Sequence, residues 1–484
     1  MKDNLTAIHN QALRILETVG IKLHHAELIQ RIRQQGVSVN NHTAFFTPGF
    51  IMDAIHRAPA SFTLRGRNPC HDIVIGGDHV NCAPGYGCAT ICAPDGKRRN
   101  AVMADYVRLA KLVHQCPHFN INGGILAQPS DVPAEQSHLL MLYAAMLSSD
   151  KCLMGVLGNR SQMQALMDLA AIAFGGRAAF TAKPHLLTLI NTISPLQIDK
   201  NALDAMIIAA QHNQPVIISP SPAAGTTGPI DMAANISLAT AEALAGIAIV
   251  QTIRPGTPVI FGLQCLGADL RTGNISIGSP AYTLQSTYTA ALARMYRLPS
   301  RCGGTLTDSP YLSPQSGYES MLNMLTTFQN GVNVVVHSAG TLDSFAAVSY
   351  EKFIMDIQII DMVKYFLKDL EVNPDTLNLE LIGRVGPGGQ FLTTMDTLKK
   401  CRTHSWNPRI GVSGNTGGGG SPSDKYLESI ADRQQAMLDS YASPPMDPAL
   451  LADLDDCMLR QGVDRGRLSA ICSQAWGNST PCNT

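Results

Sequence analysis

The chain has 484 residues, of which 45% are hydrophobic and 15% charged, and its formal net charge is −1. This balance supports a large folded core, and without an excess of either charge we expect no nucleic-acid partner. The N-terminus lacks a basic region followed by an apolar stretch, and the apolar run at 238–250 contains Glu242. We therefore expect no secretory signal, no membrane span and a cytoplasmic location.

The first 100 residues mix helical and strand patterns. Apolar residues recur at helical spacing over 3–19 up to Gly20, and a second short helix is expected at 25–35. The stretch 36–100 is punctuated by Gly, Pro and Asp, with SFTLRGR and HDIVIGGDHVNC as candidate strands. We predict that residues 1–100 form an α+β elaboration packed on the main domain.

From residue 101 onward, short apolar runs alternate with longer helical stretches. The expected strands are FNINGGIL (119–126), CLMGVL (152–157), HLLTLIN (185–191), PVIISP (215–220), PVIFGLQ (258–264), PSRCGG (299–304), VNVVVHS (332–338) and LNLELIGRVG (377–386). Eight such units predict an α/β fold, a (β/α)8 TIM barrel over 101–420, with a loop at the glycines 417–420 and a helical tail over 421–484. An open doubly wound sheet is the alternative, but no GxGxxG follows the first run.

Barrel enzymes place their active sites at the C-terminal ends of the strands. The polar residues expected at these ends are Asn122, Asn191, Ser219, Gln264, Asp308 and His337. His337 is the candidate catalytic residue, because alternation along VNVVVHS puts Asn333, Val335 and His337 on one face. If that face is the barrel interior, His337 lies at the rim. The alternative is a core histidine bonded to a backbone carbonyl.

The cysteines and histidines fit no common metal-site spacing. The twelve cysteines include no CxxC pair and read as reduced thiols. Cys82, Cys88 and Cys92 lie close in sequence but match no zinc pattern, and the HxCxH at His114–His118 precedes the first predicted strand, at the wrong end of a barrel. We predict no metal site.

Aromatic residues are few but gather in the candidate rim segments. These residues are Tyr86, Tyr311, Tyr318, Phe345, Tyr350, Phe353 and Trp406. Ring faces attract cations that have no proton to donate, such as quaternary ammonium groups. The alternative is that most of these rings cap the core, and that only two or three line a pocket.

Three long segments carry a family resemblance: APGYGCATICAPDGKRRNAVMADYVRLAKLV (83–113), GPIDMAANISLATAEALAGIAIVQTIRPGTPVIFG (228–262) and HSAGTLDSFAAVSYEKFIMD (337–356). With the GPGGQFL at 386–392 and the N-terminal helices, the chain resembles the trimethylamine methyltransferase family, in its branch without pyrrolysine. That branch includes glycine betaine:corrinoid methyltransferases. The resemblance implies methyl transfer from a methylated amine to Co(I) of a corrinoid (cobalamin) carried by a small partner protein, with no tightly bound cofactor.

The implied substrate is a quaternary amine such as glycine betaine, proline betaine or carnitine, and which one is used stays open. Its leaving group is a neutral tertiary amine and Co(I) is the nucleophile, so no proton donor or Lewis acid is needed. A non-catalytic quaternary-amine binding protein and a metal-dependent barrel enzyme are the alternatives, and a homo-oligomer also stays open.

Site roles follow from this chemistry. Tyr86 and Phe345 are the first choices for rings around the ammonium, and His337 would orient the substrate, for instance through a carboxylate. Expected wall residues of the pocket are Asn191, Gln264, Asp308 and Tyr311. Arg301 and Arg384 are candidates to pair a substrate carboxylate, although either could be a structural ion pair.

Overall fold

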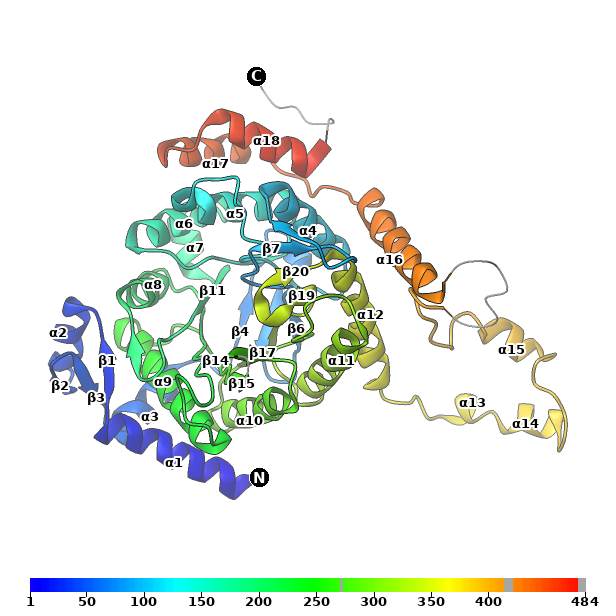
Figure 1. The fold of residues 1–484 in the computed structure, drawn as a ribbon, viewed down its shortest axis with the longest axis horizontal. Helices are drawn as coiled ribbons and strands as arrows, with labels where there is room; N and C mark the ends of the chain where they lie inside the picture. Colours follow the sequence, from blue (N-terminus) through cyan, green and yellow to red (C-terminus); the bar gives the residue numbers. More distant parts are fainter. Residues whose placement is uncertain (270–272, 413–420, 478–484) are drawn as a thin grey trace.

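Eight parallel strands form a ring at the centre of the protein in the computed structural model, which describes residues 1–269, 273–412 and 421–477 (Figure 1). In sheet order the strands are β6 (Asn81–Cys82), β18 (Val334–Val336), β17 (Ser300–Gly303), β14 (Val259–Gly262), β13 (Val216–Ile218), β11 (Leu186–Ile190), β10 (Cys152–Met154) and β9 (Ile121–Gly123). A parallel bridge between Cys82 and Phe119 closes the ring between β6 and β9. The predicted (β/α)8 fold is confirmed.

Each barrel strand is followed by one helix of the outer ring. In chain order these helices are α4 (Met103–Gln115), α5 (Ala134–Ser148), α6 (Arg160–Ala173), α8 (Lys200–Gln211), α9 (Met232–Ile253), α10 (Pro280–Tyr296), α11 (Pro314–Gln329) and α12 (Tyr350–Phe366). A further short helix, α7 (Arg177–Ala182), follows α6. Because each helix returns the chain to the same end of the barrel, all eight βα loops open on one side.

Side chains alternate between the barrel interior and the helices. Ile121, Leu187, Ile217 and Ile260 share one buried cluster with Val334 inside the ring. The interior is closed at the N-terminal end of the strands by the hairpin β4 (Ser61–Leu64) and β5 (Ile73–Gly76), whose Leu64 and Ile75 join the same cluster. The opposite, C-terminal end is left for function.

Two boundaries in the sequence prediction are wrong. The run 377–386 is not a strand, because α13 (Pro374–Leu377) and α14 (Leu379–Val385) occupy it, with Asn373 and Asn378 as N-caps and no buried residue. The remaining barrel strand is β6, inside the stretch assigned to the N-terminal elaboration. The barrel units therefore span residues 81–366 instead of 101–420, and only the part before β6 is an elaboration.

The N-terminal elaboration packs on one flank of the barrel. Its elements are α1 (Lys2–Thr18), β1 (Ile21–Leu23), α2 (Ala26–Gln34), β2 (Ser38–Asn40), β3 (Thr43–Phe45) and α3 (Pro48–Arg57). β1 pairs with β3 and also with β12 (Gln197–Ile198), which lies in the loop after β11. Helices α1 and α3 both pack on α9.

Helix α9 is buried on all sides. By length and composition it is the one candidate membrane span among the described helices, but its apolar window is fully buried within the protein. The packing of α1, α3 and α8 on α9 accounts for its apolar character, since a helix covered all round carries no polar face.

The C-terminal part has a protruding arm and three covering helices. The arm contains α13, α14 and α15 (Met395–Lys400) and projects away from the barrel (Figure 1), with Leu370, Leu379 and Leu392 strongly exposed. Helix α16 (Pro422–Asp439) packs on α12, α17 (Pro448–Arg460) on α6, and α18 (Arg465–Trp476) on α4 and α5. The predicted glycine loop at 417–420 lies outside the described residues.

Candidate functional site

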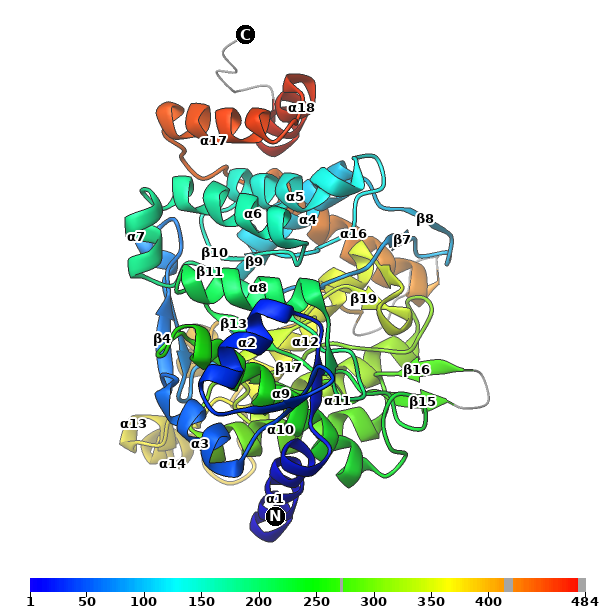
Figure 2. The ribbon, with the colours of Figure 1, turned by 90° about the vertical axis from the view of Figure 1, so that its left-hand side faces the viewer.

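The first and last βα loops meet at the C-terminal end of the barrel. The first loop carries β7 (Thr90–Cys92) and β8 (Arg98–Asn100), and the last carries β19 (Thr341–Leu342), the 3-10 turn η2 (Asp343–Phe345) and β20 (Ala347–Val348). β20 pairs in parallel with β7, so the two loops form one small sheet. This sheet and the β15 (Gly267–Asp269) and β16 (Asn274–Ser276) hairpin lie on the side opposite β4 (Figure 2).

His337 stands where the chain leaves β18. Val334 and Val336 face the barrel interior while Val335 packs with the helices, so the face predicted to carry Asn333, Val335 and His337 is not the interior one. His337 nevertheless reaches the rim, because its φ of 58° turns the chain out of the strand. Its backbone N–H donates to the Pro84 carbonyl, and its Nδ1 accepts a 3.2 Å hydrogen bond from the Tyr86 N–H.

The buried imidazole of His337 is neutral. Burial, and then the nearby charge of Arg301, hold the pKa of His337 well below its ordinary value. Since Nδ1 accepts the Tyr86 N–H, the neutral ring carries its proton on Nε2. The ring is therefore an uncharged aromatic surface with one N–H donor left for a ligand.

Two aromatic rings lie next to the imidazole of His337. The centroid of the Phe345 ring lies 4.8 Å from that of His337, and the Tyr86 centroid lies 6.5 Å away in an edge-to-face arrangement. Burial raises the pKa of Tyr86 to about 12, so its hydroxyl stays protonated. The structure thus brings together the two predicted cage rings and the predicted catalytic histidine, which we call the ring cluster.

A glycine makes room for Tyr86. A Cβ on Gly124 would lie 2.7 Å from Cδ2 of the Tyr86 ring, and Gly124 has a φ of +69°. Both facts require glycine at this position, because an alanine would meet the ring and would also adopt an unfavourable backbone conformation. The NGG sequence at the end of β9, residues 122–124, therefore seats Tyr86 against the backbone where the second βα loop begins.

Phe345 is positioned by an unusual backbone. Asp343, Ser344 and Phe345 have φ values of 50°, 48° and 80°, a left-handed run without glycine. Such conformations cost about 1–2 kcal/mol per residue and cluster at functional sites. Two backbone hydrogen bonds hold this run. The N–H of Asp343 donates to the carbonyl of Ser309, and the N–H of Ser344 donates to the carbonyl of Thr307.

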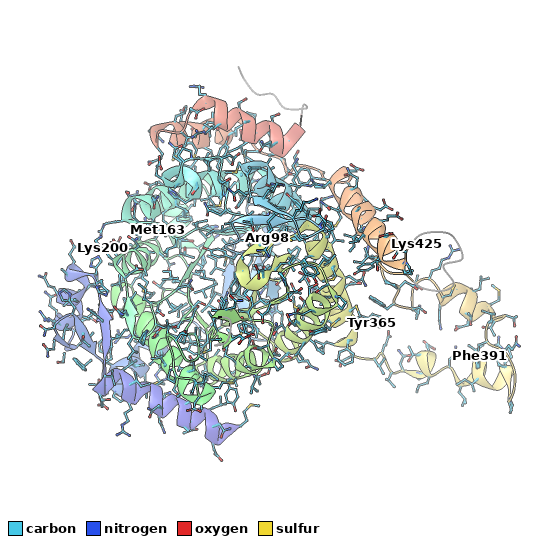
Figure 3. All side chains as sticks on the ribbon, in the orientation of Figure 1. Arg98, Met163, Lys200, Tyr365, Phe391 and Lys425 are labelled. Carbon is cyan, nitrogen blue, oxygen red and sulfur yellow. The ribbon has the colours of Figure 1, made fainter. Side chains whose placement is uncertain are left out.

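Asp308, predicted as a wall residue of the pocket, anchors this loop. Its carboxylate accepts hydrogen bonds from the Ser344 hydroxyl at 2.8 Å, the Ser276 hydroxyl at 2.6 Å and the Ile277 N–H at 2.7 Å. Arg98, labelled over this loop in Figure 3, forms a 2.7 Å ion pair with Asp343. These contacts tie the last βα loop to its neighbours on both sides.

Arg301 is a buried cation inside the barrel. It lies on β17 with no solvent exposure, while the neighbouring Cys302 faces α10. Its Nη1 donates to the Ser219 hydroxyl at 3.0 Å and to Oε1 of Gln264 at 2.6 Å. Its Nε has no partner among the described residues, and no described carboxylate forms an ion pair with it. The predicted wall residue Gln264 is thus a partner of Arg301.

The other predicted residues form no hydrogen bond or ring contact with His337 in the described part of the chain. Asn191 is exposed directly after β11, and Tyr311 is exposed near the β7–β8 hairpin. Arg384 is on the arm, in an exposed ion pair with Glu380. Asn122 is buried and donates to the Ala110 carbonyl. These positions give Tyr311 and Arg384 no contact with His337.

The described residues contain no group of three or more His, Cys, Asp or Glu that could hold a metal ion. Cavities of about 120 and 570 Å³ lie outside the barrel, both partly lined by α12 and α16, and neither includes a ring of the cluster. We place the site at the barrel mouth because it brings together two aromatic rings, the neutral imidazole of His337 and the Arg301 guanidinium, which has no acidic partner among the described residues.

Comparison with known proteins agrees with this geometry. A family model described as trimethylamine methyltransferase (MTTB) matches residues 1–466. The chain belongs to the MTTB family. It is 38% identical over 465 residues to a glycine betaine methyltransferase of Desulfitobacterium hafniense (strain Y51), covering 96% of this chain and 97% of that protein.

Two further proteins extend the comparison of this MTTB-family chain. An L-carnitine:corrinoid methyltransferase of Eubacterium limosum is 27% identical over 406 residues, covering 81% of this chain and 82% of that protein. The crystal structure of the Methanosarcina barkeri monomethylamine methyltransferase matches with a TM-score of 0.52 at 12% identity, over 91% of this chain and 87% of that one. This structural match shows that the two proteins share a fold.

Within this MTTB-family chain, Tyr282 was missed by sequence reasoning and Arg301 was left level with Arg384. Tyr282 lies in α10 and packs in a small buried cluster that Phe345 also contacts. One signal was present for Arg301, because PSRCGG is a predicted strand with a charged residue between small ones. Its inward direction depends on barrel register, which only the structure supplies.

Proposed function

We propose that this MTTB-family enzyme moves a methyl group from a quaternary amine of the betaine type to Co(I) of a corrinoid carried by a partner protein. The observation that carries the proposal is the ring cluster at the barrel mouth, formed by Tyr86, His337 and Phe345. The similar proteins also support the proposal, since one is named as a glycine betaine methyltransferase and another as an L-carnitine:corrinoid methyltransferase.

The reaction needs little acid–base chemistry from the protein. The methyl carbon leaves nitrogen, which keeps the bonding electron pair and becomes a neutral tertiary amine, while Co(I) donates the pair of the new Co–C bond. No proton moves. The neutral His337 and the protonated Tyr86 suit this reaction, because neither has to exchange a proton near neutral pH.

The chain's own contribution is to bind and orient the ammonium group. Each ring face near the cation contributes roughly 0.5–2 kcal/mol through cation–π attraction. A protonated His337 would repel the ammonium, and the pKa shift of this ring keeps it uncharged. Correct positioning of two reactants can lower a barrier by about 7–11 kcal/mol in the best cases, and it is the main rate effect we expect here.

The corrinoid is a second substrate in this scheme, brought to the mouth by a separate protein. The β7–β8 and β15–β16 hairpins flank the C-terminal side of the barrel (Figure 2), the side on which the partner must dock. A partner that docks, reacts and leaves calls for a modest, transient interface. No tightly bound cofactor is part of the proposal.

The test is a panel of quaternary amines with Co(I)alamin, free and protein-bound, in which methyl–cobalt formation is followed by absorbance without added metal. We expect transfer from at least one betaine or carnitine. Phe345→Leu and Tyr86→Leu should each raise KM about 2- to 30-fold, since each removes a ring face. Phe391→Leu, a ring on the arm, is the matched control (Figure 3).

Three outcomes would contradict the proposal or the role it gives to the ring cluster. Saturable binding of betaines in calorimetry without any methyl–cobalt product would indicate a binding protein. Transfer that depends on an added metal and is lost with a chelator would indicate metal chemistry instead. Equal activity of the Phe345→Leu and Phe391→Leu variants would show that the ring cluster does not bind the substrate.

A further inference from the structure

We propose that Arg301 and Tyr282 form the receptor for a substrate carboxylate, which restricts this enzyme to zwitterionic quaternary amines. The inference rests on the proposed function and adds which substrates the site selects. The barrel interior contains a buried positive charge without a negative charge to balance it. Arg301 is completely buried, and no Asp or Glu among the described residues pairs with its charge.

A buried guanidinium without an acid is costly. Removing a charge from water costs several kcal/mol unless a counter-charge or full hydrogen bonding compensates it. Here Ser219 and Gln264 satisfy only Nη1, and Nε has no partner in the described part of the chain. A fold that keeps such a group at the mouth of its barrel is organised to receive an anion there.

Tyr282 supplies a second unpaired donor beside the same strand. Its buried O–H donates to no acceptor among the described residues, although the backbone of Gly303 lies beside the hydroxyl oxygen. The hydroxyl oxygen lies 2.5 Å from where a Cβ of Gly303 would stand, and Gly303 is two residues beyond Arg301 on β17, on the same face. Two unpaired buried donors along one inward face match the two oxygens of a carboxylate.

The receptor adjoins the ring cluster. The charge of Arg301 acts on the pKa of both Tyr86 and His337, and Tyr282 belongs to the small cluster that Phe345 contacts. A zwitterion can therefore place its ammonium at the rings and its carboxylate at Arg301. A purely cationic amine would bring a second positive charge to Arg301 without neutralising it, so it is selected against.

Binding needs a local opening. Arg301 is sealed from solvent, whereas Tyr86 and Phe345 are partly exposed. These two rings adjoin the receptor and are its partly exposed neighbours, so we expect one of them to turn aside as the substrate enters and to close over it afterwards.

The experiment measures dissociation constants by calorimetry and methyl–cobalt formation for glycine betaine, choline and tetramethylammonium. The parent enzyme should bind glycine betaine at least tenfold more tightly than either cation. Arg301→Met should weaken glycine betaine binding about 10- to 100-fold while leaving tetramethylammonium within threefold or improving it. Tyr282→Phe, which only removes the hydroxyl, should weaken glycine betaine binding about 3- to 10-fold.

Arg384→Met is the matched control, since Arg384 is exposed on the arm and should leave all three constants unchanged. Glycine betaine binding within twofold of the parent in both Arg301→Met and Tyr282→Phe would overturn the receptor. Equal parent affinities for tetramethylammonium and glycine betaine would overturn it even if Arg301→Met does not fold. A parent that binds glycine betaine selectively but forms no methyl–cobalt product would instead overturn the proposed function alone.

Discussion

The left-handed run at residues 343–345 should depend on Asp308. Three residues at about 1–2 kcal/mol each give a conformational cost of roughly 3–6 kcal/mol for the run. Its two backbone hydrogen bonds, to Ser309 and Thr307, contribute about 0.5–1.5 kcal/mol each, and the bond from Ser344 to the Asp308 carboxylate about 1.5–3 kcal/mol. Without Asp308, the remaining bonds no longer balance the cost.

We therefore expect Asp308→Ala to release the loop that presents Phe345. Hydrogen exchange at the bonded amides of Asp343 and Ser344 should speed up at least tenfold, and kcat/KM for methyl transfer should fall about 10- to 100-fold. Asp95→Ala is the control, because Asp95 pairs only with the exposed Lys97 on the neighbouring hairpin. Exchange rates within twofold of the parent would refute the reasoning, whatever the activity.

Two further predictions concern packing and pH. Gly124→Ala should lower activity far more than Gly77→Ala, because both glycines have positive φ but only a Cβ at the first would meet the Tyr86 ring. Thermal unfolding and kcat/KM are measured for both variants. Equal losses in the two variants would contradict the steric argument. His185 stacks on Phe174 at 4.1 Å, and burial lowers its pKa to about 4. The unfolded chain then binds more protons between pH 4 and 6.5, so stability falls as pH drops through this window, by about 2 kcal/mol at pH 5. Urea unfolding at pH 7.5 and pH 5 measures this drop in the free energy of unfolding. We expect a smaller drop in His185→Phe than in the parent, and an equal drop would exclude His185 as the cause.

Most of the barrel could be predicted because its strands are short apolar runs buried on both faces. Seven of the predicted runs contain a strand of the observed barrel. The eighth prediction failed at 377–386, where LNLELI reads as alternating but is capped as a helix by Asn378. Strand β6 is the end of the candidate strand HDIVIGGDHVNC, but it was assigned to the elaboration and not to the barrel, because its two residues, Asn81 and Cys82, form no apolar run of their own. Hydrogen-bonded pairing with β18 makes this segment a strand, although its composition does not mark it as one.

The site was harder to predict because it depends on backbone conformations that local sequence does not favour. His337 was placed at the end of a strand by position alone, yet a left-handed φ turns it to the rim. Asp343 and Phe345 adopt the same region only because Asp308, Arg98 and neighbouring carbonyls hold the loop. No residue in DSF would indicate that conformation to a reader of the sequence.

The family resemblance grouped Tyr86, Phe345 and His337 in one site, and the misassigned strand β6 explains why the predicted strand order alone could not bring them together. With β6 as the first strand, residues 83–102 become the first βα loop, and barrel closure places this loop beside the last one. Tyr86 then lies next to His337 and Phe345 by topology, although the chain separates them by almost the whole barrel. When residues 83–102 are counted as part of a separate elaboration, the same tyrosine has no defined neighbour. The function of the site therefore follows from closure of the ring, a property that no single motif carries.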